Sequence, residues 1–291
     1  MDIKWIQSFI VTAKYENVRN AAEELYLTQP AVTKHIQKLE ERLQSQLFHR
    51  KGKSIHLSAD GLKFLPHAQA MVQSYEEGIQ SFRSWQQGFT KKITIASAPQ
   101  IASSVLPAIL NEFMTLNPQI EIQINIINSY NVLKEVQQGR SDIGLTRILI
   151  PHDYIKSDVL MTEKVVLVGP PNVSLEEDTA LQQYRLITDN HPVYWDKLLR
   201  EIHFHYEHIK TLPINQIEVT KRFIEQGIAI SYLPLSLIER ELAMKSVKII
   251  PSRKISLPQS NTYLLTKEST EEVLLFCSFI TKKLQNSTHT Y

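Results

Sequence analysis

Apolar residues recur at helical spacing at the start of the chain and predict an amphipathic helix there. They are Trp5, Ile6, Phe9, Ile10 and Ala13. Asp2 precedes them and is placed to cap the helix. A second, shorter helix is predicted from Val18 to Leu25 with Asn17 as its cap, and its alanines allow a neighbouring helix to approach closely.

A third helix is predicted to begin after Thr28, with Pro30 in its first turn, where a missing N–H costs nothing. Its inward positions are Val32, Ile36, Leu39 and Leu43. Its outer positions are Gln29, Thr33, Lys34, Gln37 and Lys38. A short helix, a turn and a longer helix with such a face are typical of the helix-turn-helix, whose second helix lies in the major groove. Gln, Thr and Lys side chains suit the edges of bases.

The segment "LFHRKGKSIHL", residues 47–57, predicts a wing after this helix. It contains an apolar anchor, a basic turn at Gly52 and an alternating return strand. Arg50 and Lys53 are expected to contact the DNA backbone or the minor groove. Residues 1–92 carry 13 Lys and Arg against 9 Asp and Glu, whereas residues 93–291 carry 19 against 21. A solvated charged face would explain this surplus by itself, but helix, turn and wing in this order favour DNA binding.

A long helix with heptad spacing is predicted next, with Ser58 as its cap and Pro66 bending its first turns. The stripe consists of Leu65, Ala68, Val72, Tyr75, Ile79 and Phe82. Such a stripe favours a helix pair between two chains, and packing of the stripe on its own domain is the alternative. Residues 86–92 are interpreted as a hinge.

From Lys91 onward, predicted strands and helices alternate. The first unit has strands "KKITIAS", "QIEIQINII" and "SDIGLTR", separated by helices "SSVLPAILNEFMTLNP" and "YNVLKEVQQG". The second has strands "KVVLVGPP", "YRLITDN", "LPINQIEV" and "IAISYLP", with helices "PVYWDKLLREIHFHY" and "TKRFIEQG". A strand "NTYLLTKE" and a final helix "EEVLLFCSFITKKL" are expected to return to the first unit. This order predicts two α/β units with a cleft at the carboxyl ends of the strands.

The composition excludes several classes of protein. A chain of 291 residues with 43% hydrophobic content can form two or three compact domains. It has no apolar run of eighteen residues and no signal peptide pattern, so we expect a cytoplasmic protein with no membrane partner.

Cys277 is the only cysteine and is predicted to be a buried hydrophobe. No nucleotide-binding, hydrolase or metalloprotease motif occurs, so neither an enzyme nor a cofactor is predicted. His203, His205 and His208 lack a completing ligand, and no metal site is predicted.

The segment "AAEELYLTQPAVTKHIQKLE", Ala21 to Glu40, resembles the signature "AA..L..(S/T)QPA(V/L)(S/T)..I..LE" of the LysR-type bacterial transcriptional regulators. The resemblance covers the whole chain. It implies an α+β multidomain protein with a winged helix-turn-helix DNA-binding domain (1–58), a linker and dimerisation helix (59–89) and a periplasmic-binding-protein-like effector domain (90–291). In that domain, subdomain I covers about 90–161 and 266–291, and subdomain II about 162–265.

The resemblance also implies binding residues and partners. It implies that Gln29, Pro30, Thr33, Lys34 and Gln37 lie at the DNA surface, with Arg50 in the wing. The residue pattern adds Thr28, Lys38 and Lys53 to the expected DNA-contacting residues. The expected partners are double-stranded DNA, further copies of the chain as a homodimer or a dimer of dimers, and a small-molecule effector, with RNA polymerase as a further candidate.

The candidate effector residues lie at strand-to-helix turns. They are Ser97, Ala98, Gln100, Ser103, Ser129, Thr146, Arg147, His191, Tyr194 and Thr220. Helix N-termini and a forked arginine suit an anion, although every such turn also needs capping residues. The segments "ITDNHPVYWDKLLR", "TKRFI" and "ISYLPLS" look most like the bacillus regulators of citrate synthase, which makes citrate or a related tricarboxylate a candidate effector.

Two other classes remain open. A ligand-independent architectural DNA-binding protein would show weak sequence preference and no response to ligand. An enzyme fused to a DNA-binding module would turn over a metabolite.

Overall fold

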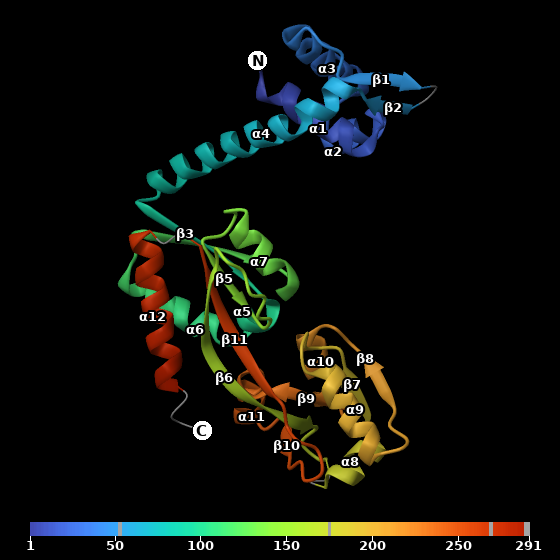
Figure 1. The fold of residues 1–291 in the computed structure, drawn as a ribbon, viewed down its shortest axis with the longest axis vertical. Helices are drawn as coiled ribbons and strands as arrows, with labels where there is room; N and C mark the ends of the chain where they lie inside the picture. The colour runs from blue at the N-terminus through green and yellow to red at the C-terminus, as the bar shows by residue number, and fades with distance from the viewer. Residues whose placement is uncertain (52–53, 174–175, 268–269, 288–291) are drawn as a thin grey trace. The chain divides into compact units, whose positions relative to one another are not determined.

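The computed structural model describes residues 1–51, 54–173, 176–267 and 270–287. The chain divides into two compact units, Met1–Gly88 and Phe89–Tyr291 (Figure 1).

Three helices begin the first unit, and their caps confirm the prediction. They are α1 (Ile3–Tyr15), α2 (Val18–Glu24) and α3 (Gln29–Leu43). The side chains of Asp2, Asn17 and Thr28 each accept a backbone N–H in the first turn of the helix that follows. Their apolar faces form one core with the inward side chains of α3, and Ala21 and Ala22 are buried where α2 meets its neighbours.

The predicted wing is present. Strands β1 (Phe48–Lys51) and β2 (Ser54–Leu57) pair antiparallel, and Leu47 and Phe48 anchor them in the core. The Glu40 carboxylate accepts the backbone N–H groups of both anchor residues, at 2.8 and 3.3 Å, and so joins the end of α3 to the wing. Gly52 and Lys53, in the predicted turn, lie outside the described residues.

Helix α4 (Ala59–Gln86) is capped by Ser58 as predicted and continues through Pro66. Its heptad stripe divides into two parts. Leu65, Ala68 and Val72 pack on the core of the first unit. The remaining stripe residues, Tyr75, Ile79 and Phe82, are 50%, 40% and 56% exposed. Packing of the stripe on its own domain therefore holds for its first half, and the helix pair between two chains stays a prediction for its second half.

The first subdomain of the second unit is the predicted βαβαβ arrangement. Its parallel strands are β3 (Lys91–Ser97), β4 (Ile120–Ile126) and β5 (Ile143–Thr146). Helices α5 (Pro99–Ser103), α6 (Leu106–Leu116) and α7 (Ser129–Gln137) connect them. Helix α12 (Glu271–Ser287) packs back on this subdomain, as predicted, through Val273, Phe276 and Ile280. Partial burial of Cys277 on α12 raises the pKa of its thiol to about 11.

The second subdomain contains β7 (Arg185–Thr188), β8 (Thr211–Pro213), β9 (Ala229–Pro234) and β10 (Lys248–Ile250). Its helices are α8 (Glu177–Gln183), α9 (Trp195–His205), α10 (Ile217–Glu225), η1 (Leu235–Leu237) and α11 (Glu239–Ala243). The prediction of a strand over "LPINQIEV" is wrong in its second half, because β8 ends at Pro213 and α10 begins at Ile217.

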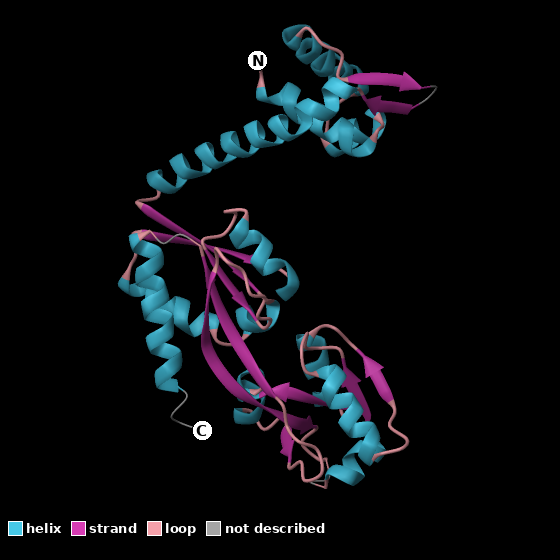
Figure 2. Cartoon of the chain, in the orientation of Figure 1, coloured by secondary structure: helices cyan, strands magenta, loops and turns pink. Residues whose placement is uncertain are grey.

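Two long strands connect the subdomains. β6 (Lys156–Gly169) and β11 (Gln259–Thr266) are antiparallel neighbours that run through both (Figure 2). Tyr263–Thr266 pair with β5, so the chain returns to the first subdomain about three residues before the expected boundary at 266. Within the described residues, the sheet of this unit has nine strands in the order β4-β3-β5-β11-β6-β9-β7-β8, with β10 on β6.

Candidate functional site

The outer face of α3 is polar and open to solvent. Because Val32, Ile36 and Leu39 are buried, the opposite side of the helix must face outward. The predicted DNA-contacting residues on this face that are exposed are Thr28, Gln29, Pro30, Lys34, Gln37 and Lys38. Thr33 is half-buried and, with Gln37, lines a hollow of about 430 Å³ between α3 and the wing strands.

Basic side chains on and beside this face are available for phosphate. The Lys38 ammonium lies 5.3 Å from the Trp5 ring centroid, a cation–π distance that leaves its charge on the surface. Arg50 lies in β1, and its side chain is outside the described set, as is the whole of Lys53. The carboxylate of Glu40, two residues after Lys38, accepts two backbone N–H groups of the wing and forms no ion pair with these basic side chains within the described residues.

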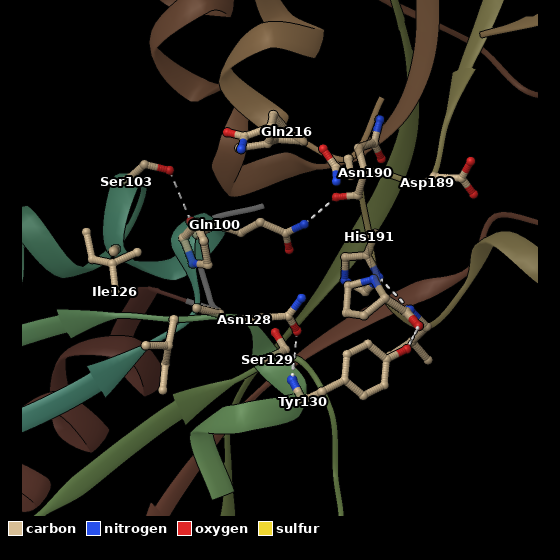
Figure 3. A pocket seen from close by; sticks show the side chains of 18 of the residues that line it. Gln100, Ser103, Ile126, Asn128, Ser129, Tyr130, Asp189, Asn190, His191 and Gln216 are labelled. Carbon is tan, nitrogen blue, oxygen red and sulfur yellow. Dashed lines mark hydrogen bonds between the residues drawn. The ribbon is translucent and has the colours of Figure 1, made fainter. Parts of the chain in front are cut away.

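A cleft of about 770 Å³ lies in the second unit, within the size range of small-molecule sites (Figure 3). Four turns surround it: residues 98–103 after β3, 126–130 before α7, 189–196 after β7 and 215–218 before α10. Of the predicted effector residues, it is lined by Ala98, Gln100, Ser103, Ser129 and His191.

The other five predicted residues lie behind this wall. Ser97 and Thr146 are buried, and Thr146 Oγ1 donates to the Ser129 carbonyl at 3.2 Å, which supports the start of α7. The Tyr194 hydroxyl donates to the Tyr232 carbonyl at 2.8 Å, and its ring stacks on His191 with centroids 4.1 Å apart. These residues shape the cleft without reaching it.

Thr220 was predicted to begin a helix, and this is wrong. It is buried in the middle of α10, where its hydroxyl donates to the Gln216 carbonyl at 3.0 Å. Since α10 begins at Ile217, this helix presents Gln216 and Glu218 to the cleft instead.

Arg147 was predicted to grip an anionic effector in the cleft, and this placement is wrong, because Arg147 does not line the cleft. Its side chain is 0% exposed, and Nη1 donates to Glu163 Oε1 at 2.8 Å and to Ser260 Oγ at 3.2 Å. Glu163 and Ser260 are opposite each other on β6 and β11, so the guanidinium joins the end of β5 to both crossover strands. The Ser236 backbone N–H also donates to Glu163, at 2.8 Å.

His191 connects this buried cluster to the cleft. Its Nδ1 accepts the Val193 N–H at 3.2 Å, so the ring proton belongs on Nε2, which donates to Ser260 Oγ at 3.0 Å. Burial, and then the charge of Arg147, lower the pKa of His191 to about 3. The imidazole in the cleft wall is therefore neutral at physiological pH.

Two hydrogen bonds cross the cleft between the subdomains. Gln100 Nε2 donates to the Asn190 carbonyl, and the Tyr130 hydroxyl donates to the Pro192 carbonyl at 3.2 Å. The Asn190 side chain is itself fixed, because it accepts from Trp195 Nε1 and donates to Ser231. The second wall of the cleft thus has a defined backbone geometry.

The charge of the cleft is acidic. Its described lining residues include Asp189, Asp196 and Glu218 and no Lys or Arg. Asp189 and Glu218 were not predicted from the sequence as cleft residues. Two signals could have indicated them: "ITDN" ends a strand, and Ile217 and Ile224 have the spacing of one face of a helix that contains Glu218.

Within the described ranges, no three His, Cys, Asp or Glu side chains come together as a possible metal site. Across the same ranges, no helix is long and apolar enough to cross a membrane.

Comparisons with known proteins agree with this architecture. Residues 3–62 match the family model "Bacterial regulatory helix-turn-helix protein, lysR family", and residues 86–284 match "LysR substrate binding domain". The chain is 36% identical over 286 residues to the HTH-type transcriptional regulator CitR of Bacillus subtilis, covering 96% of this chain and 98% of that protein. It is 34% identical to the uncharacterized regulator YxjO of the same organism, covering 95% and 96%.

Solved structures show the same fold. Full-length CbnR in complex with its target DNA has a TM-score of 0.67 at 18% identity, covering 98% of this chain and 100% of that one. Vibrio fischeri DarR in complex with DNA has a TM-score of 0.61 at 23% identity, covering 97% and 98%. With both family models matched in order, the chain belongs to the LysR family of bacterial transcriptional regulators.

Proposed function

We propose that this DNA-binding regulator recognises a specific operator through the outer face of α3 and the wing, and that a small molecule held in the cleft of the second unit controls it. The observation that supports recognition of DNA bases is the polar face of α3, which lies opposite the buried side chains of Val32, Ile36 and Leu39. Gln29, Thr33 and Gln37 can pair with base edges, while Lys34 and Lys38 can reach phosphate. Since its partner is the bacterial chromosome, we expect the protein to act in the cytoplasm.

The test is binding to sites selected from random DNA. Gln29→Ala or Thr33→Ala should weaken binding to the selected operator by about 1–3 kcal/mol and leave binding to unrelated DNA nearly unchanged. Glu41→Ala serves as a control, because this exposed acid lies near the far end of α3. Equal losses on operator and unrelated DNA would contradict base reading by these residues.

Control by a ligand is supported by the cleft itself. It has the volume of a metabolite site, and its walls come from two subdomains that are joined by two crossover strands and by hydrogen bonds such as those of Gln100 and Tyr130. A ligand that binds one arrangement of the subdomains better than another shifts the population toward it. An architectural DNA-binding protein, the alternative, predicts that no metabolite changes the pattern of DNA protection.

Citrate or another tricarboxylate, the effector suggested by the resemblance to the bacillus regulators of citrate synthase, is poorly supported by the charges in the cleft. The one positively charged group expected to grip it, Arg147, is paired with Glu163 behind the wall. The carboxylates that do line the cleft would repel a trianion.

We further expect a homodimer formed through the exposed half of the α4 stripe, with a dimer of dimers as a larger assembly. Tyr75, Ile79 and Phe82 form an exposed apolar strip at heptad spacing, beside which the ring of Trp85 stacks on Phe82. A two-fold dimer would present two copies of α3 to half-sites about one turn of DNA apart or a multiple of it.

A further inference from the structure

One polar atom in the cleft wall lacks a partner. Gln100 is 9% exposed and lines the cleft, and its Oε1 has no hydrogen-bond donor among the described residues. Figure 3 shows this oxygen turned away from Asn190 and toward Asn128.

The orientation of the Gln100 amide is fixed by its other end. The amide nitrogen faces the Asn190 backbone carbonyl, which can only accept a hydrogen bond, so the assignment of nitrogen and oxygen cannot be exchanged. Oε1 is therefore an acceptor to which no described residue donates a hydrogen bond. An unpaired buried acceptor costs about 1–3 kcal/mol, which a ligand that donates a hydrogen bond to it would recover.

The charges around the cleft indicate what kind of donor this is. Asp189 and Asp196 have no ion-pair partner in the described part of the chain, and Glu218 shares Lys221 with Glu241. None of the described residues that line the cleft is Lys or Arg, and the imidazole of His191, next to Asn190 in the chain, is neutral at physiological pH. The cleft therefore combines an unpaired acceptor with an excess of negative charge.

We propose that the effector is a small primary ammonium compound, such as an α-amino acid or a diamine, whose ammonium group binds Gln100 Oε1 and is held by the carboxylates of the cleft. An ammonium group supplies three N–H donors and a positive charge, and so uses both features at once. A neutral hydroxyl compound would satisfy only Gln100, and a polycarboxylate would satisfy neither. This inference rests on the proposed function, since it names the class of ligand that the cleft takes.

The first test compares ligands that differ in the ammonium group, using the full-length protein. Each amino acid is paired with the carboxylate that lacks its amino groups: L-glutamate with glutarate, L-aspartate with succinate and L-lysine with hexanoate. Putrescine is added as a diamine and citrate as a polycarboxylate. We expect at least one ammonium compound to raise the melting temperature and its partner without nitrogen to have no effect, because a ligand stabilises the folded state by mass action. If no ammonium compound shifts the melting temperature, the inference is wrong.

The second test places the ligand in the cleft by calorimetry. Glu218→Gln, Asp196→Asn and Gln100→Leu should each weaken binding of the ammonium compound about tenfold or more, as expected for loss of a hydrogen bond to a charged group. Glu207→Gln, which neutralises an exposed acid of the same subdomain outside the cleft, should leave binding unchanged.

The sign of the change separates the alternatives. If citrate or another carboxylate binds instead, and binds more tightly to Glu218→Gln and Asp196→Asn, the ammonium inference is overturned while the cleft remains the effector site. If the ammonium compound binds all cleft variants as tightly as the parent, its site lies elsewhere and the inference is equally overturned. A failure of operator recognition would appear only in the DNA-binding assay.

Discussion

Arg147 has a structural role that can be measured. Its guanidinium is fully buried, pairs with Glu163 and donates to Ser260, while Nε and Nη2 have no partner within the described chain. Removing one partner of a buried ion pair leaves the other charge uncompensated, which costs about 3–5 kcal/mol. We therefore expect Arg147→Ala to lower the free energy of unfolding by about this amount, measured by urea denaturation.

The matched control for Arg147 is Arg140→Ala, because Arg140 forms an ion pair with Glu135 but is 40% exposed. Exposed pairs contribute about 0–1 kcal/mol, so this variant should be close to the parent. Similar losses in the two variants would show that the Arg147 pair is solvated.

His191 predicts a pH dependence of stability. Its pKa is about 3 in the folded protein and about 6.5 in an unfolded chain, so below pH 6.5 the unfolded state takes up a proton that the folded state does not. The free energy of unfolding should therefore fall as the pH drops from 6.5 toward 3, with a contribution from His191 of up to about 1.4 kcal/mol per pH unit. Above pH 7.5 His191 should contribute no pH dependence.

His191→Gln isolates this contribution, since glutamine keeps an N–H donor for Ser260 and does not titrate. Urea denaturation of parent and variant at pH 7.5, 6.5, 5.5 and 4.5 should show a shallower loss for the variant. Parallel profiles would mean that the imidazole is accessible to protons in the folded state.

At the level of helices and strands, local chemistry predicted most of the fold. Asp2, Asn17, Thr28 and Ser58 cap the helices assigned to them, because a cap and the first turn lie within four residues of each other. Strand β3 has the predicted bounds, Lys91–Ser97. The start of α10 was misplaced because Leu212 and Ile214 alternate as in a strand, and the helix that follows has only nine residues.

The cleft was harder to predict because its residues are brought together by tertiary structure. The sequence indicated the right turns, and Gln100, Ser129 and His191 line the cleft. It gave no sign that Arg147 would face Glu163, since that depends on the register of β6 with β11. Periodicity predicts which face of an element is buried, but not which buried polar groups meet.

The junction of the wing with α4 requires a glycine. A Cβ at Gly61 would lie 2.1 Å from the Leu47 carbonyl oxygen, a backbone atom that also accepts the Ser58 N–H. Gly61→Ala should therefore destabilise the first unit by about 1–3 kcal/mol or more, as for an overpacked core, measured by thermal unfolding.

Gly78→Ala is the control in the same helix, because nothing lies within 4 Å of its Cβ position. Alanine has the higher helix propensity, so this variant should be more stable by about 0.5–1 kcal/mol. If both substitutions change the stability equally, the backbone near Leu47 can move away from the new Cβ at position 61 without a loss of stability.

On the scale of the whole molecule, control requires that ligand binding and subdomain arrangement be linked. Arg147, at the end of β5, bonds to Glu163 and Ser260 on the two crossover strands, and His191 connects this cluster to the cleft wall. The Gln100 side chain donates to Asn190 in the loop 189–196, so a ligand bound to Gln100 would be connected to the loop that contains His191. The cleft and the connection between subdomains thus share residues, which is the physical condition for a ligand to bias one arrangement.

The proposed dimer, formed through the exposed half of the α4 stripe, predicts how operator binding can be removed. Ile79→Glu places a carboxylate in the middle of the apolar strip that Tyr75 and Phe82 flank, where burial against a second helix would leave it unpaired. We expect this variant to sediment as a monomer. Because two linked half-site contacts exceed either one by about 10²–10⁴ in affinity, operator binding should fall by a comparable factor while the affinity for a single half-site is retained. Gln80→Glu adds the same charge to an exposed position off the strip and should remain assembled. If Ile79→Glu sediments as the parent does, the strip is not the interface, and the chains must associate through another surface.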